Sequence, residues 1–143
     1  MEGLEKNIKN LTSMLKELDK AIKEFELARI QPQAYREIII ELIQEGLIKR
    51  FEISFELFWK TLKDYLETEQ SISIASPKKA IHTCHNAGLL NDKEAELLLE
   101  MVDNRNVSTH DYGRDSATAF STRIPSYHKL MSDVLKKIKK ESI

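Results

Sequence analysis

Residues 48–66 read IKRFEISFELFWKTLKDYL, and this stretch decides the fold class of the chain. Its apolar side chains recur every three or four positions, which places them on one face of an α-helix. The face consists of Ile48, Phe51, Phe55, Phe58, Leu62 and Leu66, and it is widened by Leu47, Ile53, Leu57 and Trp59. A helix that is apolar over so much of its circumference is either central in its domain or also faces a partner chain.

The same periodicity predicts that this helix runs from about Ala34 to Glu67. Gly46 lies inside it, and glycine in a helix interior costs about 1 kcal/mol relative to alanine. We therefore expect a kink at Gly46 or the close crossing of another helix. Glu56 and Lys60 are four residues apart, which predicts a weak ion pair on the helix surface.

Two further long helices are predicted, one on each side of the central helix in the sequence. The N-terminal helix has apolar residues at Leu4, Ile8, Leu11, Leu15, Leu18, Ile22 and Phe25. It should close near Arg29, because Pro32 follows. The C-terminal helix, from Ser116 to about Lys140, has Phe120, Ile124, Tyr127, Leu130, Met131, Val134, Leu135 and Ile138. Pro125 should bend it, since proline removes a backbone hydrogen bond.

Capping signals between these segments predict two shorter helices. Ser76 before Pro77 is typical of a helix start, so a third helix should run from Pro77 to Asn86. Gly88 then supplies the left-handed residue that ends it. Asn91, with Glu94 three residues on, predicts a capping box at the start of a fourth helix. The apolar residues of that helix are Leu97, Leu98, Met101 and Val102.

The predicted fold class is therefore all-α. Only four glycines and three prolines interrupt the 143 residues, and no segment alternates apolar and polar residues as a strand does. About five helices with short connections indicate an antiparallel, up-and-down bundle, and the length indicates that residues 1–143 form one domain.

The composition excludes several classes of function. With 22 Lys+Arg against 23 Asp+Glu, the net charge is −1, so any nucleic-acid site has to be local. Cys84 is the only cysteine, which excludes an internal disulfide and favours a reducing compartment. No apolar run approaches the roughly 18 residues that span a bilayer. We expect a cytoplasmic protein without a membrane segment.

The densest chemistry lies in residues 104–112, which read NRNVSTHDY. Arg105 and His110 would be about 140° apart on an uninterrupted helix, so they converge only if the helix ends between them. Val107, Ser108 and Thr109 are poor helix formers, and an end near Asn106 or Val107 is expected.

An arginine and a histidine in one cleft suit phosphodiester cleavage without a metal or cofactor. The imidazole of His110 would take the proton of a ribose 2′-OH, and the Arg105 guanidinium would stabilise the charge on the phosphate oxygens. One histidine leaves the departing 5′-oxygen without an acid, and a two-fold dimer would supply a second copy. The simpler interpretation is that Arg105 complements a helix dipole and His110 is a capping or exposed ring, so spacing alone does not establish catalysis.

Other polar groups have simpler explanations. His82, Cys84 and His85 provide three ligands at most, and a helix turns residue 84 away from residue 82, so no metal site is expected. His128 is expected on a solvated face. Trp59 is expected in the core or in a dimer interface rather than stacked on a base.

The basic C-terminal run, formed by Lys136, Lys137, Lys139 and Lys140, could touch a phosphate backbone. Cations in a last helical turn are already favoured by the helix dipole. We therefore expect this run to be a solvated face.

Two motifs resemble a known family. Arg105-x4-His110-x-Tyr112, with Asn106 directly after the arginine, resembles the R-x(4-6)-H-x-Y motif of the HEPN superfamily of small helical-bundle proteins. Residues 50–66 are similar to the signature helix of the nucleotidyltransferase substrate-binding protein family within that superfamily. Arg123-Ile124-Pro125 with Tyr127 fits its last helix, so the resemblance covers roughly residues 47–130.

The resemblance implies a bundle that forms a homodimer and joins a separately encoded minimal nucleotidyltransferase in a hetero-oligomer. It implies that Arg105 and His110 are ribonuclease residues brought together across the dimer, with Asn106 assisting. It also implies that Tyr112 accepts AMP from the partner enzyme, which silences the nuclease.

Three functions remain open at this point. The chain is expected to be the substrate-binding partner subunit of a minimal nucleotidyltransferase, with RNA or a nucleotide as a further ligand. The first alternative is a metal-independent endoribonuclease toxin that AMP transfer to Tyr112 neutralises. The second is a purely structural dimeric interaction module.

Overall fold

The computed structural model describes residues 2–69, 71–105 and 109–141, and it describes only the backbone of residue 2 and residues 109–115. Within these ranges the chain forms five α-helices and no strand. The helices are α1 (Glu2–Ile30), α2 (Glu37–Glu69), α3 (Pro77–Asn86), α4 (Asp92–Asn104) and α5 (Thr109–Glu141). A short 3-10 turn, Pro32–Ala34, connects α1 to α2.

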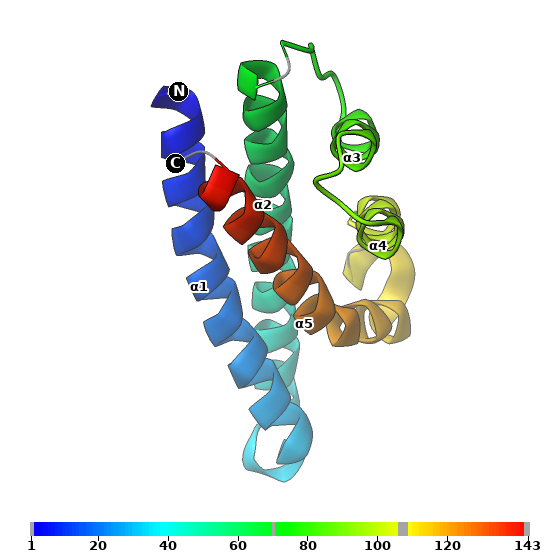
Figure 1. The fold of residues 1–143 in the computed structure, drawn as a ribbon. Coiled ribbons are helices and arrows are strands. Elements are labelled where there is room, and N and C mark those ends of the chain that lie inside the picture. Colours follow the sequence, from blue (N-terminus) through cyan, green and yellow to red (C-terminus); the bar gives the residue numbers. More distant parts are fainter. Residues whose placement is uncertain (1, 70, 106–108, 142–143) are drawn as a thin grey trace.

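Helix α2 is the central element of an antiparallel bundle (Figure 1). It packs along α1 as a long hairpin and also contacts α3 and α5, while α5 contacts α1 and α4. The far end of the α1–α2 hairpin projects beyond the other three helices (Figure 1). The start of α1 and the end of α5 lie at the opposite end of the bundle (Figure 1), where the Tyr65 hydroxyl donates to Glu141 Oε2 at 2.9 Å. The all-α bundle predicted from the helical periodicity is confirmed.

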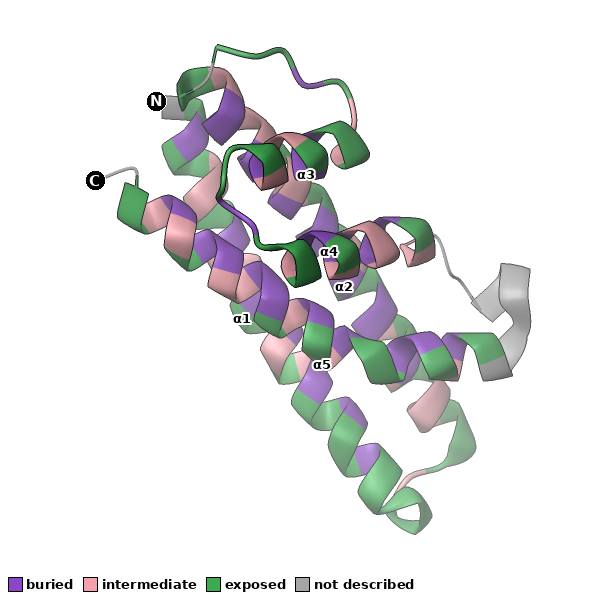
Figure 2. Cartoon of the chain, turned by 45° about the vertical axis from the view of Figure 1, so that its right-hand side comes forward, coloured by how far each residue is buried: buried purple, intermediate pink, exposed green. Residues whose placement is uncertain are grey.

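The core forms where α2 meets its neighbours, and the buried residues of every helix face inward (Figure 2). Phe51, Phe55 and Phe58 are fully buried on α2. The Phe51 ring meets Phe120 of α5 edge-on, with 5.2 Å between centroids, and lies 5.7 Å from the Tyr127 ring. The stripe in residues 48–66 is therefore the principal core face.

The ends of the two short helices are as predicted from local sequence signals. The Ser76 side chain accepts from the backbone N–H of Lys79, and α3 covers the predicted residues Pro77–Asn86. Gly88 has φ +84°, in the left-handed region. Asn91 and Glu94 form the complete capping box at the start of α4.

The long helices depart from their predicted limits. Helix α2 begins at Glu37 rather than near Ala34, because Pro32–Ala34 form the 3-10 turn. Helix α5 begins at Thr109, seven residues before the predicted Ser116, and so contains Gly113. A single interior glycine costs only about 1 kcal/mol, which a helix of 33 residues tolerates. Pro125 lies inside α5.

The close helix crossing considered at Gly46 is not present. Helix α2 continues through this residue. A Cβ at Gly46 would have one described neighbour within 4 Å, Arg50 Nη1 of the same helix, at 3.2 Å. No helix in the described ranges is both long and apolar enough to cross a membrane.

Candidate functional site

Arg105 is the described residue on which the candidate site rests. It directly follows the last residue of α4 and has helical backbone angles. Its guanidinium carbon lies 5.2 Å from the centre of the Phe55 ring, and its Nη1 lies 3.8 Å from Glu56 Oε1. Both contacts come from adjacent residues of α2, so this helix forms the wall against which Arg105 packs.

The ion pair between Arg105 and Glu56 does not include a hydrogen bond. The 3.8 Å separation from Glu56 exceeds hydrogen-bond length, and exposed ion pairs contribute at most about 1 kcal/mol. No side chain or carbonyl that the structure describes accepts a hydrogen bond from this group. Its five N–H donors form a planar fork that matches a phosphate.

A buried tyrosine hydroxyl fixes the position of this helix end. Asn104 Nδ2 donates to the Tyr127 hydroxyl at 3.3 Å, Arg123 Nε donates to it at 3.2 Å, and the hydroxyl donates to Glu100 Oε1 at 3.3 Å. A hydroxyl has one donor and two acceptor positions, so all are used. Tyr127 is only 1% exposed. Asn104 is the last residue of α4 and Tyr127 belongs to α5, so this hydrogen bond ties the end of α4 to α5 directly before Arg105.

Charges reinforce this cluster. The Arg123 guanidinium forms an ion pair with Glu100 and lies over the Tyr127 ring at 5.8 Å. The hydrogen bond to the Tyr127 hydroxyl, together with the nearby Glu100 carboxylate, raises the pKa of Arg123 above its usual value. Arg123 therefore stays charged, and it is a positioning group for the end of α4.

The predicted break in the helix between Arg105 and His110 is confirmed. Helix α4 ends at Asn104, slightly earlier than predicted, and Thr109 begins α5. Asn106 lies outside the described residues. The backbone of His110 and Tyr112 lies in the first turn of α5, but their side chains are outside the described part of the chain. The structure thus puts Arg105 directly after α4 and His110 in α5, and it leaves their side-chain separation undescribed.

The prediction of a Glu56–Lys60 surface pair is wrong. Glu56 instead lies beside Arg105 and accepts from Trp59 Nε1 at 3.2 Å. Arg105, which directly follows α4, meets the Glu56 carboxylate across the interface between α4 and α2. Trp59 is half-buried and packs against the core. A sequence pattern within one helix does not reveal such a competing partner.

No metal cluster of three or more His, Cys, Asp or Glu occurs among the described residues. Cys84 is buried, and burial raises the pKa of its thiol to about 12. His82 is exposed on another face of α3, while His85 Nε2 lies 2.7 Å from Asp92 Oδ1. Cys84 is therefore turned away from His82, as predicted.

His128 does not lie on a solvated face, which corrects the prediction from sequence. Its ring is half-buried, and Nε2 donates to the Leu15 carbonyl oxygen at 2.9 Å. The carbonyl can only accept, so Nε2 carries the proton. This hydrogen bond connects α5 to α1.

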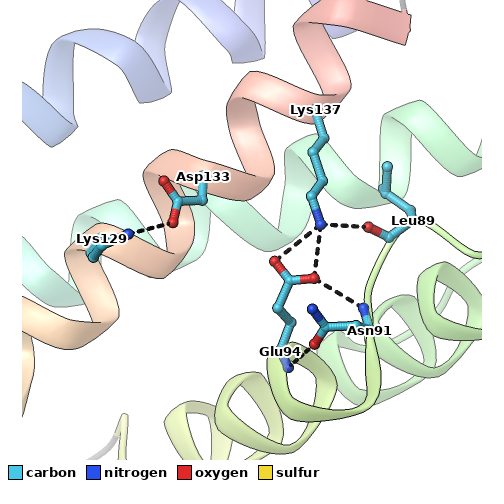
Figure 3. A network of polar contacts seen from close by, with 6 residues as sticks. All are labelled: Leu89, Asn91, Glu94, Lys129, Asp133 and Lys137. Carbon is cyan, nitrogen blue, oxygen red and sulfur yellow. Dashed lines mark hydrogen bonds and ion pairs between the residues drawn. The ribbon is translucent and has the colours of Figure 1, made fainter.

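In the basic C-terminal run, Lys136 and Lys140 are exposed, as predicted for a solvated face. Lys137 departs from that prediction, because it bonds to groups at the start of α4 (Figure 3). Its Nζ bonds to both carboxylate oxygens of Glu94, at 2.8 and 3.0 Å, and to the Leu89 carbonyl oxygen at 3.2 Å. Glu94 also accepts from the Asn91 backbone, so the capping box is itself held by α5. In the same view Lys129 forms an ion pair with Asp133 along α5.

The sequence predicted Arg105 as a site residue but did not predict the residues that hold it in position. Arg123 and Tyr127 are four residues apart, so their contact could have been inferred from helical spacing. Glu100 and Glu56 carry no comparable signal, because each reaches its partner across a helix interface.

Comparison with known proteins identifies the family. The model of the family described as "nucleotidyltransferase substrate binding protein like" matches residues 6–140. The chain belongs to this family. The resemblance to the nucleotidyltransferase substrate-binding protein family, drawn from residues 50–66, is confirmed. No curated protein matches the chain significantly.

Solved structures that resemble this member of the family include two bacterial proteins. A Thermus thermophilus protein of known crystal structure is 36% identical, with a TM-score of 0.67, over 85% of this chain and 98% of its own. A Haemophilus influenzae protein is 19% identical, with a TM-score of 0.74, over 92% of this chain and 98% of its own. Its structure is described as revealing the fold of a substrate binding domain of a nucleotidyltransferase. The second likeness supports the fold.

Proposed function

We propose that this chain is the substrate-binding subunit of a two-protein complex whose catalytic subunit is a separate, minimal nucleotidyltransferase. The family match over residues 6–140 supports the pairing. The description of the Haemophilus influenzae protein as a substrate binding domain of a nucleotidyltransferase supports it further.

The subunit is proposed to act as a homodimer within this complex. The projecting end of the α1–α2 hairpin carries exposed apolar side chains: Leu27, Ile30, Ile38 and Leu42. Gln44 of α2 accepts from Thr118, nine residues along α5 from its start at Thr109. We propose that two copies associate through this end of α2, which the Gln44–Thr118 contact connects to α5.

A ribonuclease site at Arg105 is the second part of the proposal. The observation that supports it is the guanidinium at the end of α4, half-exposed and without a hydrogen-bonded carboxylate among the described side chains. His110 follows in the first turn of the next helix. Asn106, between them, would assist in holding the phosphate.

In this reaction the imidazole of His110 accepts the proton of a ribose 2′-OH, and the 2′-oxygen attacks phosphorus. Arg105 stabilises the charge on the equatorial phosphate oxygens. The bond from phosphorus to the 5′-oxygen breaks, and the imidazolium of the second subunit protonates the leaving oxygen. The products are a 2′,3′-cyclic phosphate and a 5′-OH end.

The test uses the purified full-length protein, single-stranded RNA and EDTA. Cyclic phosphate ends should form, and Arg105→Ala and His110→Ala should each reduce the rate at least about 100-fold. Arg50→Ala and His82→Ala are matched controls, because both side chains are exposed away from this helix junction, and they should cleave normally. The absence of cleavage at any protein concentration would leave the chain a binding subunit or a purely structural module.

Tyr112 is proposed as the residue through which the transferase controls this site. A phenol can accept an AMP group with release of pyrophosphate, and the added charge would repel RNA beside Arg105. After incubation with the transferase and ATP, intact-mass and peptide analysis should find AMP on Tyr112. An unmodified Tyr112 in an active transferase complex contradicts this control.

A further inference from the structure

A groove between α1 and α5 lies on a different part of the surface. Its volume is about 600 Å³. It is lined by residues of α1 from Thr12 to Lys23 and residues of α5 from His128 to Lys139. The two helices lie side by side in Figures 1 and 2, and the hydrogen bond from His128 to the Leu15 carbonyl holds them together.

Positive charge is concentrated in this groove. Its lining includes Lys16, Lys20, Lys23, Lys136 and Lys139 with one carboxylate, Asp19. Five lysines less one aspartate give +4, whereas the whole chain has a net charge of −1. The groove is therefore a local positive field on a nearly neutral protein.

Three of these lysines are available to a ligand. Lys20 pairs with Glu17 at 3.2 Å, and Lys23 pairs with Asp19 at 2.8 Å. Lys16, Lys136 and Lys139 form no ion pair with any residue whose side chain the structure describes. They come from both walls, so an anion between the helices would meet ammonium groups on two sides.

The inner surface of the groove is mostly apolar. Leu15 and Leu135 form part of it, and the aliphatic stems of the lysines extend it toward the rim. Small-molecule sites of about 300–1,000 Å³ typically combine an apolar lining with a few charged groups. A ligand that fits must therefore carry both an apolar face and several negative charges.

We propose that the α1–α5 groove binds a nucleoside polyphosphate. The base lies against Leu15 and Leu135, and the phosphates lie among Lys16, Lys136 and Lys139. A cationic ligand is repelled by the net charge of +4, and an inorganic anion makes no use of the apolar surface. This inference rests on the proposed substrate-binding function and gives it an anionic, nucleotide-like substrate class.

The test is calorimetric titration of the isolated full-length protein with ATP at low ionic strength. ATP should bind, and Lys16→Glu/Lys136→Glu should weaken binding at least about tenfold, because charge-assisted hydrogen bonds are replaced by repulsion. Lys60→Glu/Lys93→Glu is the matched control: both lysines are exposed on α2 and α4, and the net charge changes by the same −4. The control should bind ATP as the parent does.

Three further ligands separate the contributions. Adenosine and inorganic tripolyphosphate should each bind at least about tenfold more weakly than ATP, since each lacks one half of the contacts. If either one binds as tightly as ATP, the base does not need the apolar inner surface or the phosphates do not need the lysines, which contradicts the proposal. Binding of an RNA oligonucleotide without binding of ATP, or no binding of ATP at millimolar concentration, overturns the proposal. That outcome leaves pairing with the transferase intact, because pairing is measured separately by co-purification.

Discussion

The Tyr127 hydroxyl joins three polar groups near the candidate site. It connects Asn104 and Glu100 of α4 to Arg123 of α5 while the ring packs on Phe51 in the core. The position of Arg105, the next residue after Asn104, depends on this connection.

Tyr127→Phe should keep the ring packing and remove the hydroxyl. Three partners then lose a hydrogen bond in a partly buried position, so the free energy of unfolding should fall by about 1–3 kcal/mol. Urea unfolding followed by circular dichroism measures the change. Tyr35→Phe is the control, because Tyr35 lies in the loop after the 3-10 turn, and its midpoint should stay that of the parent. Equal midpoints for the two variants would show that the cluster contributes nothing.

Glu94 is the charged counterpart of Tyr127 at the other end of α4 (Figure 3). Burial raises its pKa, but the hydrogen bond from the Asn91 backbone and the bonds and charge of Lys137 outweigh burial, so the pKa lies below its usual value of 4.5. A lowered pKa in the folded state means that the carboxylate form stabilises the fold.

The pH dependence follows from that direction. The stabilisation by Glu94 is fully present above pH 4.5, the usual pKa, and is lost as the pH falls through the lowered pKa of the folded state. Glu94→Gln should therefore reduce the free energy of unfolding by about 0.5–2 kcal/mol at pH 7, and by less near pH 3. Urea titrations at both pH values measure it. Glu96→Gln, exposed on the same helix, should show no such pH-dependent difference.

Helix boundaries are decided mainly at the scale of a few residues. Ser76, Gly88 and the Asn91–Glu94 box act through backbone groups within three or four positions, so their roles were predictable without knowledge of the fold. Gly46 and Gly88 differ in the backbone conformation that each position requires. Gly46 has ordinary helical surroundings, whereas Gly88 requires a positive φ.

The same substitution should consequently have opposite effects at these two glycines. Gly88→Ala forces a Cβ into the left-handed region at φ +84° and should lower the free energy of unfolding by about 1–2 kcal/mol. Gly46→Ala should raise it by up to about 1 kcal/mol, because alanine is the better helix former. The Cβ would lie 3.2 Å from Arg50 Nη1, the mobile end of an exposed side chain that can move aside. Thermal unfolding of both variants checks the signs, and a loss of stability in both would refute them.

At the scale of the whole molecule, the apolar residues of α2 exceed what the core uses. Ile38 and Leu42 remain 51% and 54% exposed, and Ile30 at the end of α1 is 74% exposed. The sequence allowed a central helix or a helix that also faces a partner. Helix α2 is central, and its exposed apolar end supports the second role as well.

Ile38→Glu/Leu42→Glu should therefore convert a dimer to a monomer. Each subunit would carry two new glutamates, and these would face the two glutamates of the other subunit across the two-fold interface. Burying these like charges away from water should weaken association at least about 100-fold. Sedimentation velocity across a range of protein concentrations measures the change. Ile72→Glu, exposed in the loop before α3, is the control and should stay dimeric. A monomeric parent protein would contradict the dimer itself.

The sequence by itself determined the all-α class, the limits of α3, the capping box, the core stripe of α2, the helix break between Arg105 and His110, and the family. Each of these depends on periodicity, on contacts within one turn, or on a motif contained in one segment. Only the tertiary structure decided that His128 bonds to α1, that Lys137 holds Glu94, and that lysines of α1 and α5 share one groove. These contacts join residues far apart in the sequence, and they depend on how each helix is rotated against its neighbour, which packing of the complete core sets.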